Sequence, residues 1–272
     1  KTAIDVAMIV LNLNFKEAAA WIRGQLGVLP MSEPEKKPDI DAQRAALNEQ
    51  LKALQAPKDT DAQVYLMGRN LPLPRFGVAF IKSMFFEKNA ITGQSIYQPA
   101  MVCKIRRGQD VCGLHTTFLE QNKKIGQRCH YKIETITGGY IPFYDERKEQ
   151  PEIVIVGEGV ESTLSAMKHF KTAYGIAAIN AGGLENFNPP DYVTDLIIVV
   201  DSDNEAKINE KGEKSEASFR GLIAAIKLMQ RMSKTNISTE AYSIITDING
   251  NLTVSCIKRG NKSVDFNDFI RG

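Results

Sequence analysis

The most constraining feature of the sequence is an alternation of short apolar runs with helical segments in the second half of the chain. Residues 153–156 form a β-branched run typical of a strand buried on both faces, and Glu158 follows between two glycines. From Val160 onward the apolar residues have helical spacing. Further strands are expected over residues 174–179 and 196–200. Strands that alternate with helices predict right-handed crossovers and a parallel sheet.

Acidic residues follow the ends of two of these expected strands. Glu158 follows the first strand, and Asp201 and Asp203 follow the third. Ligands of such sheets bind beyond the carboxyl ends of the strands, and residues two apart in a strand point to the same side. Carboxylates that converge repel each other unless they share a proton or bind a hard divalent cation, and we favour the cation. Taken singly, each acidic segment is also compatible with an ordinary turn or helix cap.

These segments resemble the Toprim domain, which bacterial-type primases, topoisomerases and some nucleases share. Residues 158–166 and 262–268 are most similar to the Toprim domain of primases encoded by phages and plasmids. In that family the glutamate and the Asp-x-Asp pair hold Mg²⁺ or Mn²⁺. The resemblance implies that the catalytic residues and metal ligands are Glu158, Asp201 and Asp203, with Glu161 and Asp265 as additional metal ligands.

A local excess of positive charge precedes this region. Residues 100–132 contain seven Lys and Arg against two acidic residues, and residues 100–124 resemble the amino-terminal part of the polymerase core in the same primases. That family commonly has arginine where this chain has Thr116. Such a charge run alone is compatible with a solvated face, but beside a Toprim site it predicts binding to phosphates. The expected nucleic-acid- and nucleotide-binding residues are Lys104, Arg106, Arg107, His115, Lys123, Lys124, Arg128 and Lys132.

Composition bounds the class of protein. The chain has 272 residues, 43% hydrophobic and 24% charged, which is typical of a globular protein long enough for two domains. Residues 1–150 carry 21 Lys and Arg against 16 Asp and Glu, whereas residues 151–272 carry 13 against 16. No apolar run approaches the roughly 18 residues that span a bilayer, and no signal peptide opens the sequence, so we expect a cytoplasmic protein without a membrane partner. The four cysteines lack the paired spacing of a zinc site or disulfide framework.

The chain divides into four expected parts. Residues 1–29 form two helices that resemble the segment following the zinc ribbon of primases, so we expect a zinc module to be missing upstream. Residues 30–56 are a proline-containing linker and a helix, and residues 57–150 are a basic α+β subdomain. Residues 151–272 are the Toprim domain, an α/β fold with a mostly parallel sheet flanked by helices.

The resemblance implies a DNA primase core that synthesises short RNA primers on single-stranded DNA from nucleoside triphosphates for a mobile genetic element. A Gly-x-x-x-x-Gly-Lys phosphate loop is absent from the sequence, so we expect a separate replicative helicase as partner. A Toprim metal-dependent nuclease and a catalytically silent nucleic-acid-binding replication module remain alternatives. A topoisomerase needs a nucleophilic tyrosine domain, which is not recognisable. The dinucleotide-binding fingerprint fits poorly, because Glu158 would face the phosphates and Ser162 replaces the third glycine.

Overall fold

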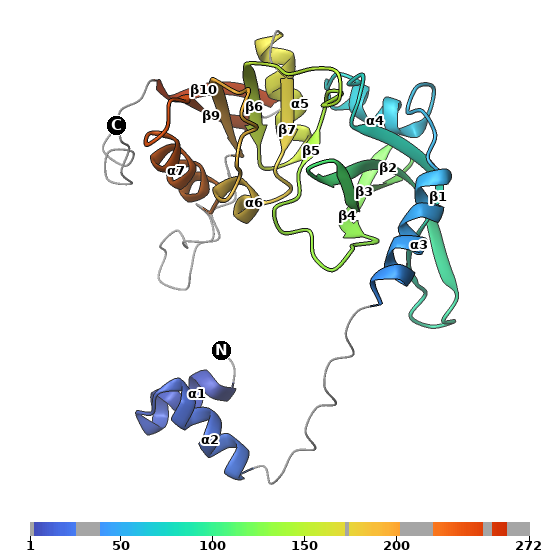
Figure 1. Cartoon of the computed structure of the whole chain (residues 1–272). Helices are drawn as coiled ribbons and strands as arrows, with labels where there is room; N and C mark the ends of the chain where they lie inside the picture. Colours follow the sequence, from blue (N-terminus) through green and yellow to red (C-terminus); the bar gives the residue numbers. More distant parts are fainter. Residues whose placement is uncertain (1–2, 26–38, 172–173, 202–219, 247–251, 260–272) are drawn as a thin grey trace. The chain divides into compact units, whose positions relative to one another are not determined.

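The computed structural model describes residues 3–25, 39–171, 174–201, 220–246 and 252–259 (Figure 1). The chain forms two compact units, Lys1–Asp39 and Ile40–Gly272. None of the helices within the described ranges is long and apolar enough to cross a membrane.

The first unit is a helical hairpin of α1 (Ala3–Leu11) and α2 (Phe15–Gln25). A reciprocal capping box starts α2, because the Glu17 amide donates to Asn14 Oδ1 at 3.0 Å and the Asn14 amide donates to Glu17 Oε2 at 2.9 Å. Ala18 is fully buried and allows the two helices to approach closely. The predicted pair of helices is therefore confirmed.

The second unit begins with two helices and an antiparallel sheet of strand order β1-β2-β3-β4. The elements are α3 (Ile40–Lys52), α4 (Asp61–Gly68), β1 (Val78–Lys88), β2 (Ser95–Arg107), β3 (Asp110–Glu120) and β4 (Lys123–His130). Strand β4 lies at one edge of this sheet. The residues of β4 are mostly polar and exposed, so they lack the alternation of apolar and polar residues that indicates a strand.

Both faces of this antiparallel sheet are covered. Alternate residues of a strand point to opposite faces, so Val102 and Cys103 of β2 enter different hydrophobic clusters. Val102 packs in the cluster that contains Leu47 of α3. Cys103 packs in the cluster that contains Leu66 of α4. β3 is likewise buried on both faces from Cys112 to Leu119, and this stretch includes the polar residues His115, Thr116 and Thr117.

A second sheet has the strand order β10-β9-β8-β6-β7-β5. Its strands are β5 (Ile141–Pro142), β6 (Ile153–Gly157), β7 (Tyr174–Ala177), β8 (Asp195–Asp201), β9 (Ser238–Thr246) and β10 (Leu252–Arg259). The pairs β8–β9, β6–β8 and β6–β7 are parallel, and the edge strands β10 and β5 are antiparallel to their neighbours. The predicted α/β fold with a mostly parallel sheet is confirmed. The two-residue strand β5 is too short to have been recognised from periodicity.

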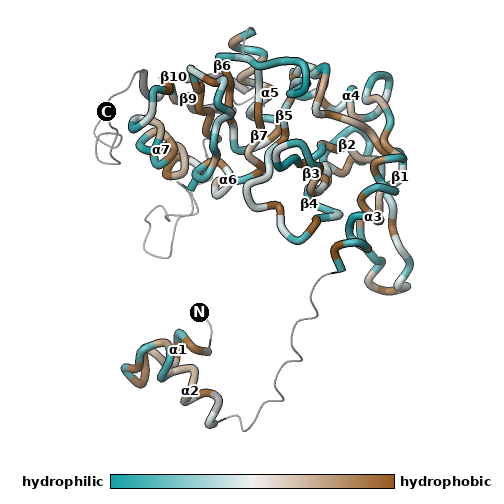
Figure 2. The backbone as a smooth tube through the Cα atoms, viewed as in Figure 1, coloured by the Kyte–Doolittle hydropathy of each residue, from teal (hydrophilic) through white to brown (hydrophobic). Residues whose placement is uncertain are grey.

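Helices cover both faces of the second sheet. They are α5 (Val160–Phe170), α6 (Ala181–Glu185) and α7 (Arg220–Met232). Val154 and Val156 of β6 pack with α6 and α7, whereas Ile155 between them packs with Ala166 of α5. Figure 2 shows hydrophobic stretches along the strands of this layer. The short helix α6 lies where a turn was predicted after the second strand.

The two sheets share one hydrophobic cluster. Val160 and Leu164 of α5 pack with Leu66 of α4 and with Leu119 of β3. A backbone bridge between Arg106 and Tyr140 also connects β2 to the segment that leads into the second sheet. Residues 57–150 and 151–272 are thus in direct contact within the second unit, and the four-part division drawn from the sequence stays a prediction.

Candidate metal and nucleic-acid site

The candidate metal site lies at the carboxyl ends of β6 and β8. Gly157 of β6 pairs with Val199 of β8 in parallel register, so Glu158 lies level with Val200, one residue before Asp201. Glu158 is partly exposed. The structure thus places the backbones of Glu158 and Asp201 side by side at the carboxyl ends of β6 and β8, as the sequence predicts. We call this end of the sheet the candidate metal edge. The side chain of Asp201 and the whole of Asp203 and Asp265 lie outside the described residues.

Close packing at Gly157 fixes the turn that presents Glu158. A Cβ atom at Gly157 would lie 2.4 Å from Thr163 Oγ1 and 3.3 Å from the Thr163 nitrogen, so no side chain fits there. Thr163 Oγ1 in turn donates to the carbonyl oxygen of Gly159 at 2.7 Å. The first turn of α5 therefore packs directly on the end of β6.

The donor chemistry at this edge fits a hard divalent cation. Carboxylate oxygens are the ligands that Mg²⁺ and Mn²⁺ prefer, and Glu158 and Asp201 are the acids at the two strand ends. The described side chains contain no group of three His, Cys, Asp or Glu that could hold a metal ion by themselves. A complete site at this edge would therefore need the side chains of Asp201 and Asp203.

Glu161 contacts three residues of the domain that contains the antiparallel sheet. Its carboxylate accepts a hydrogen bond from the Tyr65 hydroxyl at 2.5 Å and lies 3.2 Å from both Arg69 Nη2 and Lys124 Nζ. Burial acts to raise the pKa of Glu161, but Lys124, the Tyr65 hydroxyl and Arg69 together hold it below its usual range. Burial and the Glu161 charge also raise the pKa of Tyr65. Glu161 therefore connects α5 to α4 and β4, while its role as a metal ligand stays a prediction.

A tight turn places two predicted basic residues beside this carboxylate. Gln121 and Asn122 connect β3 to β4 with φ angles of 47° and 62°, as a two-residue hairpin turn of the primed type requires. Lys123 and Lys124 follow directly. Together with Arg69, which directly follows α4, they line a hollow of about 620 Å³. The hollow offers three cationic side chains around one carboxylate, which is suited to an anionic ligand.

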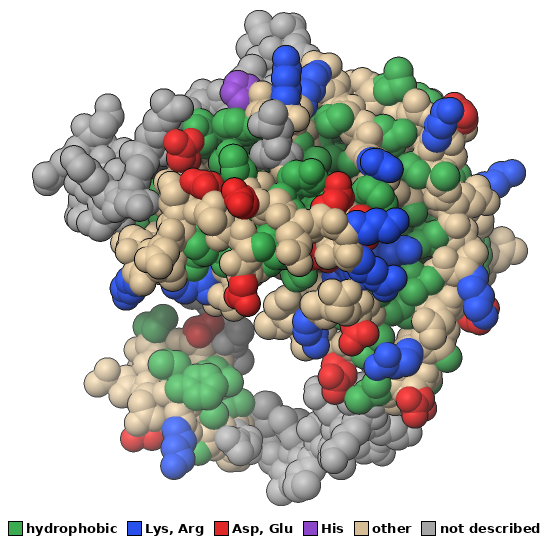
Figure 3. All heavy atoms as spheres, turned by 45° about the horizontal axis from the view of Figure 1, so that its top comes forward, with side chains coloured by type: hydrophobic (Ala, Val, Ile, Leu, Met, Phe, Trp, Pro, Cys, Tyr) green, Lys and Arg blue, Asp and Glu red, His purple; other side chains and the backbone are tan. Residues whose placement is uncertain are grey.

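The remaining predicted basic residues do not share that face. The Arg128 guanidinium lies 5.2 Å from the ring centre of Phe86 and 5.1 Å from that of Phe118, in the layer under α3. Arg106 pairs with Glu146 at 3.7 Å, and Arg107 donates to the carbonyl oxygen of Thr135. Lys104 and Lys132 are exposed. Figure 3 shows Lys and Arg side chains grouped in the right half of the visible face with acidic side chains beside them.

His115 is buried on the face of β3 that turns toward α4. It is 7% exposed, and its Nδ1 atom has no hydrogen-bond partner among the described residues. Burial, with a smaller effect of Lys124, lowers the pKa of His115 to about 4. The ring is therefore neutral near pH 7 and has no positive charge for a phosphate. Its predicted contact with nucleic acid or nucleotide would have to be a neutral hydrogen bond.

The cysteines whose side chains the structure describes lie in the antiparallel sheet and form no disulfide bond. Cys103 and Cys112 are buried free thiols and Cys129 is a partly buried one. Burial raises the pKa of Cys103 to about 12, so its thiol stays protonated.

Comparison with protein families defines the class of the second sheet. Residues 153–272 match the family model of the Toprim domain, and residues 41–132 match a domain of unknown function, DUF7146. The chain therefore carries a Toprim domain, a module of metal-dependent, nucleic-acid-related proteins such as primases and nucleases. Toprim domains bind divalent metals such as Mg²⁺ through acidic residues. No curated protein and no solved structure matches the chain.

Sequence reasoning missed two residues that the structure brings to Glu161. Tyr65 lies on α4 and Arg69 directly follows its last residue, both more than 90 positions before Glu161 in the chain. They are four apart and so share one face of the helix end. That spacing alone carries no signal for a contact with a distant carboxylate.

Proposed function

We propose that this protein is the catalytic core of a DNA primase of the mobile-element type. The observation that carries the proposal is the position of the basic hollow next to the Toprim domain. Lys123 and Lys124 line this hollow, and Lys124 pairs with Glu161, which follows Glu158 by three residues. Synthesis of a primer needs an acidic metal edge and a separate cationic surface for template or triphosphate. Both elements belong to one compact unit of this chain.

In the proposed mechanism, the acids at the strand ends hold Mg²⁺ or Mn²⁺, which when bound polarises phosphate oxygens and stabilises the attacking and leaving oxygens. Glu158 follows Gly157, where the first turn of α5 packs so closely that no side chain fits. Lys123 and Lys124 attract the phosphates of template or nucleotide. Glu161 holds the Lys124 ammonium in place, so less side-chain entropy is lost when a phosphate binds.

A Toprim nuclease is the second candidate, because the acidic edge alone is sufficient for metal-assisted cleavage of a phosphodiester. The basic hollow on the antiparallel subdomain favours synthesis, since cleavage needs no site for a triphosphate. A catalytically silent binding module would use the same hollow without the acids.

The deciding experiment supplies labelled nucleoside triphosphates, mixed-sequence single-stranded DNA and Mg²⁺ or Mn²⁺ to the whole chain. We expect short oligonucleotides, and we expect Glu158→Gln to abolish them while Glu152→Gln, an exposed glutamate just before β6, leaves them unchanged. A dinucleotide primer is included in a parallel reaction, so that elongation is measured separately from initiation. Shortening of the template without any product would establish the nuclease, and DNA binding without either reaction would establish the silent module.

Calorimetric titration with Mn²⁺ tests the metal edge independently of the reaction. We expect Glu158→Gln, Asp201→Asn and Asp203→Asn each to weaken Mn²⁺ binding, because each removes an anionic oxygen ligand. Glu152→Gln serves again as the control. Equal binding by all variants would remove the metal site from this edge.

A further inference from the structure

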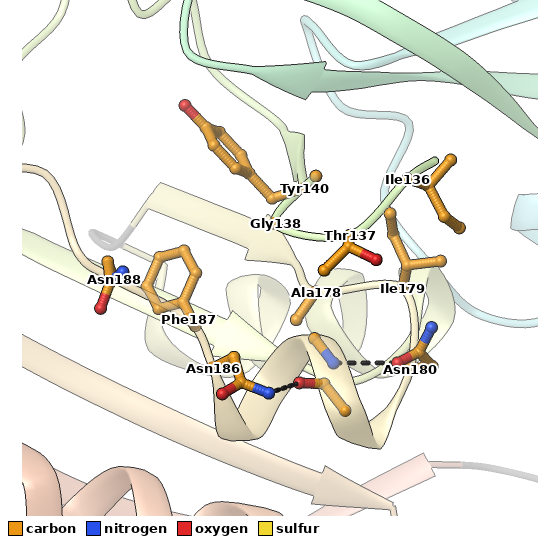
Figure 4. A pocket seen from close by; sticks show the side chains of 13 residues that line it. Ile136, Thr137, Gly138, Tyr140, Ala178, Ile179, Asn180, Asn186, Phe187 and Asn188 are labelled. Carbon is orange, nitrogen blue, oxygen red and sulfur yellow. Dashed lines mark hydrogen bonds between the residues drawn. The ribbon is translucent and has the colours of Figure 1, made fainter. Parts of the chain in front are cut away.

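A second hollow lies at the same edge of the parallel sheet as Glu158. It encloses about 320 Å³ between residues 136–140, the end of β7 and α6 (Figure 4). The amide of Ala178, which lines the hollow, donates to the carbonyl oxygen of Gly157 at 2.8 Å, one residue before Glu158. The hollow therefore adjoins the candidate metal edge on the β7 side. Cavities that hold small molecules have volumes of roughly 300–1,000 Å³.

The chemistry of this hollow differs from that of the basic one beside Glu161. None of the described residues that line it is Asp, Glu, Lys, Arg or His. The side chains that line it therefore offer no formal charge to neutralise a phosphate or an ammonium group. The lining therefore fits an uncharged ligand or the uncharged part of a larger one.

The side walls of the hollow are apolar. In Figure 4, Tyr140 and Phe187 lie on one side, and Ile136 and Ile179 lie on the other. The two aromatic rings meet edge to face, with centroids 6.3 Å apart and an interplanar angle of 84°. Aromatic and branched aliphatic walls of this kind favour a flat, unsaturated ring between them.

Two asparagine amides supply polar contacts at the base of the hollow. Asn180 Oδ1 accepts from the Gly183 amide at 2.9 Å, and Asn186 Nδ2 donates to the Gly182 carbonyl oxygen at 2.9 Å. These backbone partners fix which way each side-chain amide faces. The Asn180 NH₂ group remains a donor and Asn186 Oδ1 remains an acceptor, since neither has another partner among the described residues.

The backbone at the wall of the hollow is strained. Ile179 has a φ of 76°, which is unfavourable for a β-branched side chain. Ile179 lies two residues after the end of β7 and directly before Asn180. Strain of this kind persists where the surrounding structure over-determines it and is concentrated at ligand sites.

We propose that this hollow binds the base of a nucleotide whose phosphates lie at the Glu158 edge. A nucleobase is flat and uncharged, and its edge carries hydrogen-bond donors and acceptors, for which Asn180 and Asn186 each offer one free amide group. The inference rests on the proposed function for the phosphate half of the ligand. Binding of the base itself is a property of the hollow and is measurable without metal or catalysis.

The test uses the whole chain and the four uncharged ribonucleosides, with saturation-transfer difference NMR as the readout in metal-free buffer. We expect at least one nucleoside to bind saturably and ribose 5-phosphate to give no signal. Thr137→Tyr places a ring in the hollow and is expected to weaken nucleoside binding by about tenfold or more, which corresponds to about 1.4 kcal/mol. Asn186→Ala removes the acceptor and is expected to weaken it as well. Thr92→Tyr, at an exposed threonine of the β1–β2 turn, is the matched control.

The outcomes separate this inference from the proposed function. Nucleoside binding that Thr137→Tyr and Asn186→Ala weaken, with no oligonucleotide synthesis by the unmodified chain, would support the base site and overturn the primase. Synthesis whose KM for nucleotide is unchanged in both variants would support the primase and overturn the base site. Absence of nucleoside binding to the unmodified chain would also overturn the base site. Thermal unfolding of each variant shows whether it is folded. If Thr137→Tyr does not fold, the comparison of Asn186→Ala with the unmodified chain decides the test.

Discussion

At the scale of single residues, the structure separates acids that the sequence grouped together. Glu158 and Glu161 are three positions apart, yet Glu158 is presented at the strand edge, and Glu161 is held by Tyr65, Arg69 and Lys124. The difference arises because Glu158 lies in the turn between β6 and α5, whereas Glu161 lies in the first turn of α5, within reach of Tyr65 on α4 and Lys124 on β4. Residue type alone predicts a metal ligand in both cases, whereas only the fold shows that Glu161 is held by Arg69 and Lys124.

Glu161→Gln is expected to lower the free energy of unfolding by about 1–3 kcal/mol at neutral pH, because it leaves Arg69 and Lys124 without their anion. The pKa of Glu161 is held below its ordinary value of 4.5, so its stabilisation is present above that pH and is lost as the pH falls through the folded-state pKa. Urea unfolding at neutral pH and at about pH 3 should therefore show a difference that shrinks in acid.

The matched control is Glu120→Gln, an exposed glutamate at the end of β3. It should change stability by no more than about 0.5 kcal/mol. A Glu161 variant as stable as this control would show that the three contacts contribute nothing measurable.

His115 should make the protein less stable in mild acid. Its pKa is about 4 when folded and 6.5 when exposed, so between these values the unfolded chain binds the additional proton and stability falls as the pH falls. The loss is at most about 1.4 kcal/mol per pH unit for this group. We expect His115→Gln to flatten the pH dependence of urea unfolding between pH 6.5 and about 4, and His169→Gln, at an exposed histidine of α5, to leave it unchanged. Equal slopes in all three proteins would contradict a buried neutral His115.

At the scale of elements, the turn between β6 and α5 is the feature on which the candidate site depends. The β6 strand is held between β7 and β8, and Gly157 lets the first turn of α5 pack on its end. A shift of this turn would move Glu158 away from the end of β8. The packing of α5 on the end of β6 therefore places the Glu158 backbone beside the end of β8.

Gly157→Ala is expected to destabilise the fold by about 1–3 kcal/mol, since its Cβ would lie 2.4 Å from Thr163 Oγ1 and force α5 to move. Thermal unfolding measures the loss, and Mn²⁺ titration measures its effect on the edge. Gly68→Ala is the control, because a Cβ at this residue at the end of α4 meets no atom within 4 Å. Equal stability of the two variants would show that the close approach at Gly157 is not required.

At the scale of the whole molecule, the second unit joins an antiparallel sheet to a mostly parallel one through a shared cluster that includes Leu66 and Leu164. This arrangement places the Lys123 and Lys124 hairpin beside the first turn of the Toprim helix α5. The basic surface and the acidic strand ends therefore belong to one packed unit.

Replacing Lys123 and Lys124 together by alanine is expected to lower the affinity for single-stranded DNA. The slope of log affinity against log salt should flatten by roughly one to two units, at about 0.7 for each lost phosphate contact. Fluorescence anisotropy over a salt series measures both quantities. The double variant Lys82→Ala and Lys88→Ala, on exposed residues of β1, is the control, and Mn²⁺ binding should be unchanged in both. An unchanged slope in the first variant would place the nucleic-acid path elsewhere.

The local sequence determined the parallel strands, their helices and the candidate acids at Glu158 and Asp201. Apolar β-branched runs and helical spacing are properties of neighbouring residues, so they can be read without the fold. Strand β4 and helix α6 were missed because a polar exposed strand and a five-residue helix leave no periodic signal.

The tertiary structure alone decided which side chains meet. The Tyr65–Glu161 contact spans 96 positions, and the opposite orientations of Lys124 and Arg128 follow from the β3–β4 register and its irregularity at Phe118/Leu119. The uncharged hollow beside Glu158 likewise combines residues 136–140 with the end of β7. Such contacts depend on how separate elements pack together, and no short-range pattern in a sequence encodes that packing.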